Sequence, residues 1–563
     1  MTLLLKNNGV IDNINDYRGI FLRNIILSIY QKWLYSKNAG KVDASGSEYA
    51  CGGRKERSVQ DALLILKLVQ DYSKWTKKQI IIEFLDVEKF FDTRYFKKLP
   101  IEAYNSGVRG SSWQCYKTIN EEKVCVPSLP SGKCSPIEMK NVFAQGSCDA
   151  VLMAWPLMDS ENKVPSDAFS TSCCIEGIRI DQLSFVDDLA QFTKCTAETK
   201  KRNVGNEVFE KKNRLHFKVP KCKLMERLKE TVEICLNGEV MEVVENHKYL
   251  GTKISSNGER VVDMNERMKQ SNSVANEVVQ ICKETELSRI RLRYVKLLMG
   301  SCLDSKIKFG SSLWNILKSS KAVDELDRIK PRLMKLVIEL PMSTPSAAIQ
   351  YEFGINNLSI EILMEKVVHA VQTLQADDDR IAKRLFSALY EKKVPGFCTE
   401  VADACKILGV CFEELVDKTD IRSFLKERIV EIQGKQLLQK MLLSSKMDRV
   451  LLSGFRFDGE VMKYLCELDF VDARAVFMTR YRMLPTKSNF PGRWKGTECN
   501  ICGFEDTDVH VLTCPGYSDL NVCGLVSLDV FWNVESLKDM AVLAPAAKMM
   551  KKMIERMEEI KDI

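Results

Sequence analysis

The stretch LSFVDDL, residues 183–189, decides the fold of this chain: a short apolar run ends on two adjacent carboxylates, Asp187 and Asp188. About a hundred residues upstream, a second apolar run, IIIEFL at residues 80–85, ends on Asp86. Short apolar runs rich in β-branched residues are typical of buried strands. Two strands that each bring aspartate to the same edge of a sheet can hold a pair of divalent cations. The sequence therefore predicts a cation site at this edge.

The residues before the Asp-Asp pair predict a β-hairpin. Ile178 and Ile180, followed by the apolar residues 183–186, suit two strands that turn at Asp181-Gln182 and carry both aspartates at the far end. Adjacent aspartates are also common in ordinary surface turns. Taken alone, the pair therefore leaves a plain turn as the alternative interpretation.

Length and charge limit the possible functions. At 563 residues the chain exceeds a single hydrophobic core, which stops growing at roughly 250–300 residues, so we expect two to four domains. Lys and Arg exceed Asp and Glu only by 83 to 76, so a nucleic-acid partner requires basic charge gathered on one surface. Residues 54–57, 74–78 and 289–296 could supply that charge, and the alternative for each run is a solvated helix face.

The cysteines and the hydropathy pattern indicate a cellular compartment. Twenty cysteines are scattered over a long chain and do not form a compact disulfide pattern. The sequence shows no secretory signal and no apolar stretch of the roughly 18 residues that a membrane-spanning helix needs. We therefore expect a reduced, intracellular protein that does not enter a membrane.

Seven motifs in a consistent order surround the aspartates. FLDVEKFFD (84–92), VFAQGS (142–147) and FVDD (185–188) resemble motifs A, B and C of the reverse transcriptases of non-LTR (LINE-type) retrotransposons. DYRGI (16–20) and GRKERS (53–58) resemble the fingers motifs of that family, and KVPKCK (218–223) and YLG (249–251) resemble its motif D and the turn that follows. Seven ordered matches over roughly 235 residues do not arise easily by chance.

The resemblance implies roles for the aspartates and for one aromatic residue. Asp86, Asp187 and Asp188 would hold two Mg²⁺ ions. One ion lowers the pKa of the attacking 3′ hydroxyl, and the other neutralises the leaving pyrophosphate. Phe91 would lie under the incoming sugar, in the volume that a 2′ hydroxyl needs, and so favour deoxynucleotides. Outside the motif order, Phe91 would be read as a core residue.

The resemblance also implies residues that bind nucleotide and template. Gln145 and Gly146 would let the backbone approach the templating base, because glycine leaves room and the amide can hydrogen-bond. Lys221 would place a cation near the triphosphate, and Arg54 and Arg57 would lie on the fingers near template or triphosphate. The plain alternatives are a helix-start glycine and solvated basic side chains.

Several positions depart from the family pattern. The fingers have YACGG (49–53) and ERS (56–58) where the family usually has Gln-x-Gly-Phe and Gly-Arg-Ser. Ser147 is followed by Cys148 and Asp149 in place of proline, and Lys218 stands where asparagine is expected. The departures leave the predicted metal ligands intact and predict altered template handling.

The second half of the chain reads as mostly helical. Residues 260–345 resemble the family's thumb, whose basic helix would follow the minor groove of an A-like duplex; an ordinary helix bundle is the alternative. Candidates for the basic face are Arg289, Arg291, Arg293 and Lys296. We expect an α+β chain with a right-hand polymerase divided into fingers and palm (1–230), thumb (231–345), helical region (346–490), zinc module (491–520) and C-terminal helical tail (521–563).

A cysteine–histidine cluster lies near the C-terminus. Cys499, Cys502, His510 and Cys514 form a Cys3His set, which predicts a closed, structural Zn²⁺ site that folds a small module. Chance clustering among twenty cysteines is the alternative. The module resembles the C-terminal zinc module of LINE-type proteins. Residues 493–495, Arg-Trp-Lys, suit stacking and phosphate contact with single-stranded nucleic acid.

The resemblance as a whole implies an RNA-directed DNA polymerase, a transferase that extends a DNA primer on an RNA template with deoxynucleotide triphosphates. It implies a nuclear or cytoplasmic location. The chain opens inside the fingers, so we expect an N-terminally truncated element without the family's endonuclease. The alternative is a decayed or domesticated copy that only binds nucleic acid, favoured by the altered fingers motifs. An intron-encoded maturase is a third reading, which the zinc module and thumb pattern disfavour.

Overall fold

The computed structural model describes two compact units. The first comprises Met1–Asp263 with Gln372–Glu400, and the second Met264–Val371 with Val401–Ile563. The division into fingers, palm, thumb, helical region and zinc module stays a prediction. The structure describes residues 2–5, 13, 17–20, 24–88, 90, 99–121, 123–126, 128–129, 132–139, 173–227, 233–284, 292–444, 446–452, 454–520, 527–533 and 536–561.

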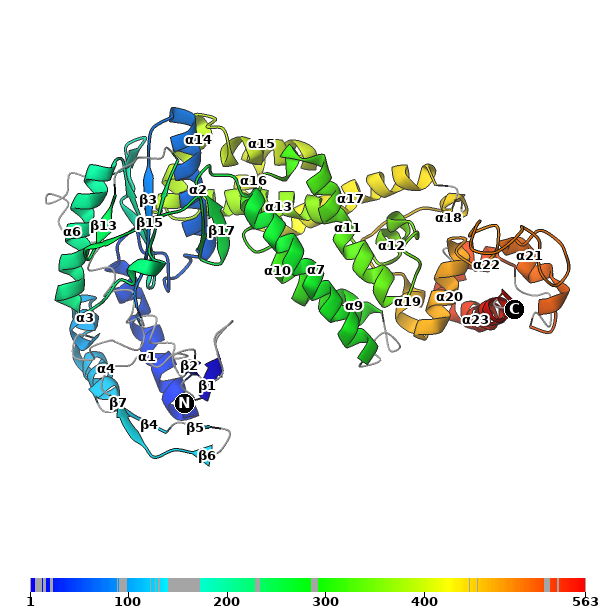
Figure 1. Cartoon of the computed structure of the whole chain (residues 1–563), viewed down its shortest axis with the longest axis horizontal. Helices are drawn as coiled ribbons and strands as arrows, with labels where there is room; N and C mark the ends of the chain where they lie inside the picture. The colour runs from blue at the N-terminus through cyan, green and yellow to red at the C-terminus, as the bar shows by residue number, and fades with distance from the viewer. Residues whose placement is uncertain are drawn as a thin grey trace. The chain divides into compact units, whose positions relative to one another are not determined.

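The first unit mixes helices and strands (Figure 1). Its helices are α1 (Ile25–Ala44), α2 (Val59–Thr76), α3 (Leu99–Asn105), α4 (Gly110–Glu121), α6 (Thr196–Asn213), η4 (Val219–Lys221) and α14 (Ile381–Glu391). Its strands are β1 (Thr2–Leu5), β2 (Tyr17–Ile20), β3 (Ile81–Asp86), β4 (Lys123–Cys125), β5 (Ser128–Leu129), β6 (Gly132–Lys133), β7 (Ile137–Met139), β8 (Cys174–Ile175), β9 (Ile178–Arg179), β10 (Gln182–Phe185), β11 (Asp188–Thr193), β12 (Lys223–Glu226), β13 (Cys235–Leu236), β14 (Glu239–Val240), β15 (Glu242–Val243), β16 (Asn246–Tyr249) and β17 (Thr252–Ser255).

A five-stranded sheet of order β10-β11-β3-β12-β15 forms the centre of this unit. β3 pairs antiparallel with β11 on one side and β12 on the other. Its apolar sequence is buried on both faces up to Asp86, as expected for a central strand. The mixed helical and sheet composition confirms the predicted α+β class.

The two faces of the sheet differ. Ile81, Leu85 and Leu189 belong to the hydrophobic core, together with Phe209 of α6. Successive side chains of a strand point to opposite faces, so Asp86 shares the other face with Phe84. The apolar face of β3 therefore anchors the strand, while its second face and its last residue border a polar site.

The hairpin that carries the aspartates turns later than the sequence suggested. β10 and β11 pair with Phe185 opposite Asp188, so the turn consists of Val186 and Asp187. The predicted turn at Asp181-Gln182 was wrong: Gln182 is the first residue of β10. β11 is buried from Leu189 to Thr193, and the pairing of the two strands fixes the turn between them. Val186 adopts φ 61°, a strained conformation for a β-branched residue.

Residues 372–400, which were predicted as part of the helical region, belong to the first unit. Helix α2 begins at a capping box between Ser58 and Asp61 and carries a buried Lys67–Asp71 pair, 2.5 Å apart. The other carboxylate oxygen of Asp71 accepts a hydrogen bond from Phe397 N at 2.9 Å. Arg380, before α14, donates to Glu56 O at 2.9 Å. These bonds join the segment 372–400 to α2 and to the loop before it.

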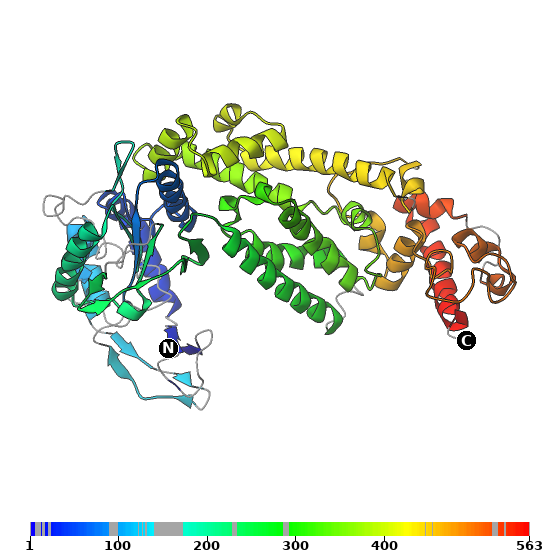
Figure 2. The ribbon, with the colours of Figure 1, turned by 45° about the horizontal axis from the view of Figure 1, so that its top comes forward.

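In the described part of the second unit, every regular element is a helix (Figure 2). Helix α20 packs on the C-terminal helix α23. Three helices, α7 (Val261–Glu284), α13 (Leu358–Gln375) and α15 (Phe397–Leu408), cross the boundary between the units. The others are α9 (Arg293–Leu298), η5 (Met299–Asp304), α10 (Ser305–Ile307), η6 (Ser311–Leu313), η7 (Ile316–Lys318), α11 (Ser320–Val337), α12 (Ser346–Glu352), α16 (Phe412–Val416), α17 (Ile421–Leu442), α18 (Asp448–Leu452), α19 (Lys463–Glu467), α20 (Phe470–Arg480), α21 (Asp508–Thr513), η8 (Pro515–Tyr517), α22 (Asp529–Trp532), η9 (Ser536–Lys538) and α23 (Met540–Lys561).

Helix composition bears on membrane insertion. Among the residues that the structure describes, none of the helices combines the length and the apolar character needed to cross a membrane.

Candidate active site

Two of the predicted ligands form a cross-strand pair. Asp188, the first residue of β11, lies opposite Asp86, the last residue of β3. Side chains of directly opposed residues share one face and lie about 4.5–5.5 Å apart at Cβ. Asp187 occupies the adjoining turn. The strand pairing thus brings all three aspartates to one corner of the sheet.

Lys221 joins this corner through the neighbouring strand. Its Nζ lies 3.4 Å from Asp86 Oδ1. Lys218 N donates to Asp86 O at 2.9 Å, and Asp86 N donates to Cys222 Sγ at 3.4 Å. The motif KVPKCK is therefore bonded to the end of β3 by its backbone and by a thiol, which places the Lys221 ammonium beside the carboxylates.

A pocket of about 270 Å³ opens over the aspartates. Its lining includes Asp86, Asp188 and Lys221 together with residues 247–251. Phe84 also lines it and makes tilted ring contacts, with ring centroids 4.6 Å from His247 and 5.1 Å from Tyr249. The turn YLG, predicted from its resemblance, thus lines the same pocket as Asp86 and Asp188.

The electrostatics of the pocket centre on Asp188. Loss of solvent around the carboxyl, followed by the negative charges of Asp187 and Asp86, raises the pKa of Asp188 to about 7, against a lowering by Lys221. The residue as a whole remains exposed, because the carboxyl lies at the mouth of the pocket. Without a cation, the corner therefore concentrates more negative charge than Lys221 neutralises.

His247 is a pocket residue that sequence reasoning missed. Burial, and then the charge of Lys223, lowers the pKa of His247, so the ring is neutral at pH 7. Its position two residues before the motif residue Tyr249 was the available signal, since alternate residues of a strand share a face. A neutral imidazole offers one donor and one acceptor to a bound molecule.

The two fingers arginines are engaged with the backbone. Arg54 donates to Asp43 O and lies 2.7 Å from Asp43 Oδ1, and it also donates to Ser47 O. Arg57 donates to Glu48 O at 2.8 Å and Ala50 O at 3.1 Å. The two guanidinium groups therefore hold the end of α1 and the loop 45–52 that follows it in place.

That loop abuts the hairpin of the aspartates. Cys51 N donates to Ser184 O at 2.8 Å, and Ser184 N donates to Tyr49 O at 3.0 Å. A Cβ on Gly52 would meet Val186 N at 2.6 Å and Phe185 C at 2.8 Å, closer than real Cβ contacts. Glycine at position 52 therefore allows the loop to press against the turn that carries Asp187.

Other predicted site residues lie outside the described residues. These include Phe91, Gln145 and Gly146, and the thumb residues Arg289 and Arg291. Only the backbone of Arg293 is described. Lys296 donates to Gly459 O at 3.0 Å, and burial lowers its pKa. The basic face predicted for the thumb thus stays a prediction.

The Cys3His set converges. The ligand atoms of Cys499, Cys502, His510 and Cys514 lie within 4.8 Å of one another, and this group can hold a metal ion. In the described part of the chain no second group of three or more candidate ligands meets this closeness, the three aspartates of the sheet corner included. Thr507 caps α21 by accepting from His510 N at 3.2 Å, which orients the histidine toward the cysteines.

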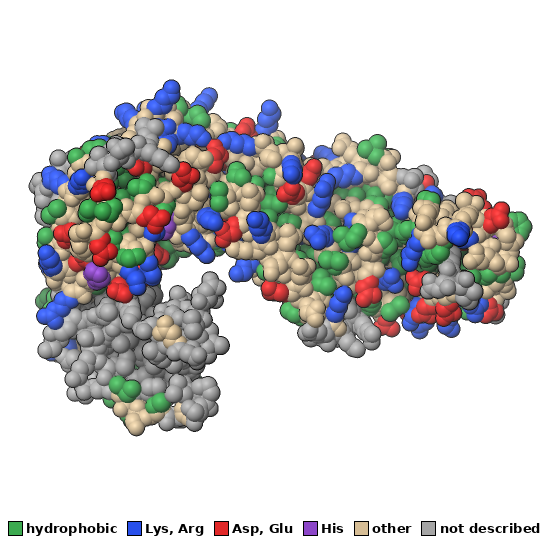
Figure 3. Space-filling model, in the orientation of Figure 1, with side chains coloured by type: hydrophobic (Ala, Val, Ile, Leu, Met, Phe, Trp, Pro, Cys, Tyr) green, Lys and Arg blue, Asp and Glu red, His purple; other side chains and the backbone are tan. Residues whose placement is uncertain are grey.

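Basic side chains are spread over the visible surface. On the face in Figure 3, Lys and Arg alternate with Asp and Glu over the described parts of each unit. Residues 54–57 illustrate the mixture: Lys55 pairs with Glu56 at 3.1 Å, while Arg54 and Arg57 bond the backbone. Local clusters, more than net charge, must therefore attract an anionic partner.

No protein-family model and no curated protein matches the chain. Among solved structures it is similar to telomerase of Candida tropicalis with a TWJ fragment of telomeric RNA (13% identity, TM-score 0.31, 68% of this chain and 56% of that one). It is also similar to the corresponding Candida albicans complex (11%, 0.31, 72% and 56%) and to apo telomerase of Candida tropicalis (12%, 0.33, 71% and 60%). The chain thus spans less than two thirds of each of these chains, and function has to be argued from the site itself.

Proposed function

We propose that this chain is an RNA-directed DNA polymerase of a LINE-type retroelement, which extends a DNA 3′ end on an RNA template. The observation that carries the proposal is the pairing of Asp188 with Asp86 across β11 and β3, beside Asp187 and Lys221. The ordered motifs that surround these residues in the sequence support the same reaction.

The donor set suits divalent cations. Mg²⁺ prefers carboxylate oxygens, and Asp86, Asp187 and Asp188 supply them from one corner of the sheet. The raised pKa of Asp188 reflects the loss of solvent around its carboxyl and then the charges of Asp187 and Asp86, and a bound cation would favour the ionised form. Two Mg²⁺ ions held there would supply the activation of the 3′ hydroxyl and the neutralisation of the pyrophosphate.

Lys221 is suited to act on the triphosphate. Its ion pair with Asp86 is long, at 3.4 Å, and the side chains are 58% and 37% exposed. Exposed ion pairs of this kind contribute little stability. We therefore expect the ammonium to exchange Asp86 for a phosphate oxygen when a nucleotide binds. The proposed roles of Phe91 under the sugar, and of Gln145 and Gly146 at the template, rest on the resemblance alone.

Arg54 and Arg57 fit an indirect role in this proposal. Because both donate to backbone carbonyls at the end of α1 and in the loop 45–52, they would hold Gly52 against the hairpin rather than contact template. A loop positioned in this way would fix the turn of Asp187 at the distance that the reaction requires.

Polymerisation can be tested directly. Purified protein is given a primed homopolymeric RNA, Mg²⁺ and the complementary deoxynucleotide, next to the double variant Asp187→Asn, Asp188→Asn. We expect metal-dependent incorporation by the natural sequence and none by the variant. Retained RNA binding without incorporation above the variant would reject the polymerase and support the alternative, a copy that only binds nucleic acid.

Substitution of Gly52 should impair the same reaction. In Gly52→Ala the new Cβ has to displace the backbone at Phe185 and Val186, and a shift near 1 Å at a reacting group can lower rates about a hundredfold. Primer extension at saturating nucleotide measures the effect. Gly40→Ala is the matched control: it lies in helix α1 with nothing within 4 Å, and we expect unchanged activity and equal or higher stability. Full activity of Gly52→Ala would refute the contact.

We also propose that the Cys3His group binds one structural Zn²⁺. Three thiolates and an imidazole close a tetrahedral site with no open position, which suits a structural rather than a catalytic ion. Burial works against ionisation, but backbone N–H groups of Ile501 and Cys502 lower the pKa of Cys499 to about 7, so one thiolate is available at neutral pH.

Removal of that zinc should unfold its module locally. We expect a metal-to-protein ratio near one in native material, and a fall in protease resistance around residues 497–517 after chelation or in Cys514→Ser. Cys411→Ser, an exposed cysteine outside the group, should behave like the natural sequence. A ratio near zero in protein purified without chelators would exclude the zinc.

A further inference from the structure

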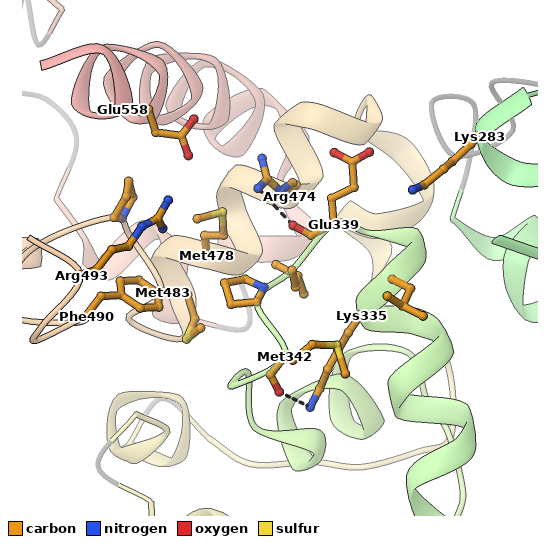
Figure 4. A pocket seen from close by; sticks show the side chains of 14 residues that line it. Lys283, Lys335, Glu339, Met342, Arg474, Met478, Met483, Phe490, Arg493 and Glu558 are labelled. Atoms are coloured by element: carbon orange, nitrogen blue, oxygen red, sulfur yellow. Dashed lines mark hydrogen bonds between the residues drawn. The ribbon is translucent and has the colours of Figure 1, made fainter. Parts of the chain in front are cut away.

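A second pocket, of about 420 Å³, lies within the second unit and is unrelated to the aspartates (Figure 4). Such a volume falls in the range of roughly 300–1,000 Å³ that is usual for ligand sites. Side chains from the end of α11, from α20, from residues 483–493 and from α23 converge on it. Four of them are basic: Lys283, Lys335, Arg474 and Arg493.

Two of these cations are fixed in the wall. Lys335 is buried and donates to Met342 O at 3.2 Å and Ser346 Oγ at 3.3 Å, which leaves one of its three N–H groups without a partner among the described residues. Arg474 donates to Glu339 O at 3.1 Å, while its buried Nε has no partner in the described structure. Each of these donors could take up an anionic group that enters the pocket.

The remaining wall is apolar and polarisable. Met478, Met483 and Phe490 line it, and Figure 4 shows them on the same side as Arg493. Phe490 packs edge-on against Trp494, with ring centroids 6.4 Å apart, and this contact holds the ring in place. An aromatic ring with thioethers around it forms a suitable platform for a flat base.

Two carboxylates, Glu339 and Glu558, complete the lining. They repel an acidic peptide, whereas the exocyclic amino groups of a base can donate to them. A nucleotide thus has a partner for each part of the wall: phosphate for the cations, base face for Phe490, and amino groups for the carboxylates. We propose that this pocket binds a nucleotide of a single-stranded nucleic acid, at a site separate from the proposed polymerase site.

The test measures binding to the full chain without deoxynucleotides or divalent cations. Fluorescent polyuridylate, polythymidylate and a blunt duplex are titrated against the natural sequence, Phe490→Leu and Arg493→Gln. Lys426→Gln is the matched control, because it removes an exposed charge of α17 without lining the pocket. Arg493 is exposed, so its variant should fold normally, and Phe490→Tyr keeps a ring if Phe490→Leu lowers stability.

We expect Phe490→Leu and Arg493→Gln each to weaken single-strand binding about tenfold, and Lys426→Gln about twofold or less. Duplex binding should not respond to Phe490→Leu. A loss confined to RNA or to DNA would identify the natural strand, and an equal loss would mean that base and phosphate suffice. Equal effects of all three substitutions, or no effect of Phe490→Leu, would overturn the proposal. Binding of polyglutamate that is weakened by the same substitutions to the same extent would also overturn the proposal.

Discussion

Asp188→Asn is expected to lower Mg²⁺-dependent nucleotide incorporation by a factor on the order of 10²–10³ or more while making the metal-free protein more stable at neutral pH. The loss of activity follows from the loss of a proposed cation ligand beside Asp86. The gain in stability follows from the removal of a carboxylate that loses solvent on folding and that Asp187 and Asp86 repel.

The pH dependence of this gain has a definite sign. The pKa of Asp188 is raised from 3.8 to about 7 in the folded chain, so the folded state holds the proton more tightly than the unfolded state does. The stability that this proton contributes is present below pH 4 and is lost as the pH rises through 7. Because asparagine does not ionise, the stability of Asp188→Asn should not fall in this way as the pH rises.

Denaturant unfolding in a chelator at pH 5 and pH 8 measures the difference. We expect the free energy of unfolding of Asp188→Asn, relative to that of the natural sequence, to be higher at pH 8 than at pH 5. Added Mg²⁺ should reduce this difference, because the cation compensates the same charge. Asp324→Asn, an exposed aspartate of α11, is the control and should show no such trend. An active Asp188→Asn enzyme, or a stability difference that is independent of pH, would contradict the expectation.

Arg480→Met should destabilise the second unit by roughly 3–5 kcal/mol. Arg480 Nε lies 2.5 Å from Glu352 Oε1, and both side chains are fully buried. Tyr481 Oη donates to the same carboxylate, and Arg480 donates to the carbonyl oxygens of Phe531 and Trp532. Removal of the guanidinium leaves Glu352 as a buried charge without its cation and takes the Arg480 hydrogen bonds away from two carbonyls.

Two comparisons isolate the cause. Arg482→Met removes a partly exposed pair with Asp448, 3.2 Å apart, and should cost less than about 1 kcal/mol. The double variant Glu352→Leu, Arg480→Met removes both charges and should recover part of the loss, because no unpaired charge remains buried. Denaturant unfolding followed by tryptophan fluorescence reports all three. If Arg480→Met lowered the free energy of unfolding no more than Arg482→Met does, the ion pair of Arg480 with Glu352 would not be what stabilises the contact between α20 and α12.

The sequence by itself predicted those features that depend on residues close to one another in the chain. The apolar runs that end at Asp86 and before Asp187 predicted buried strands, and these are β3 and β10. Cys499 and its three companions predicted a metal-binding group that does converge. Each depends on residues close in the chain or on a period of two or 3.6 residues.

Only the tertiary structure decided which distant residues meet. The pairing of β3 with β11 places Asp188 opposite Asp86. The pairing of β10 with β11 places the turn at Val186-Asp187, not at Asp181-Gln182 as the sequence suggested. In the folded chain Arg54 and Arg57 donate to backbone carbonyls, and Gly52 lies against the hairpin. Residues 372–400 belong to the same unit as α2, although they are far from it in the sequence. Periodicity reports which face of an element is buried, but not what covers it. Contacts between segments depend on how the whole chain packs, and for that reason they became visible only in the folded structure.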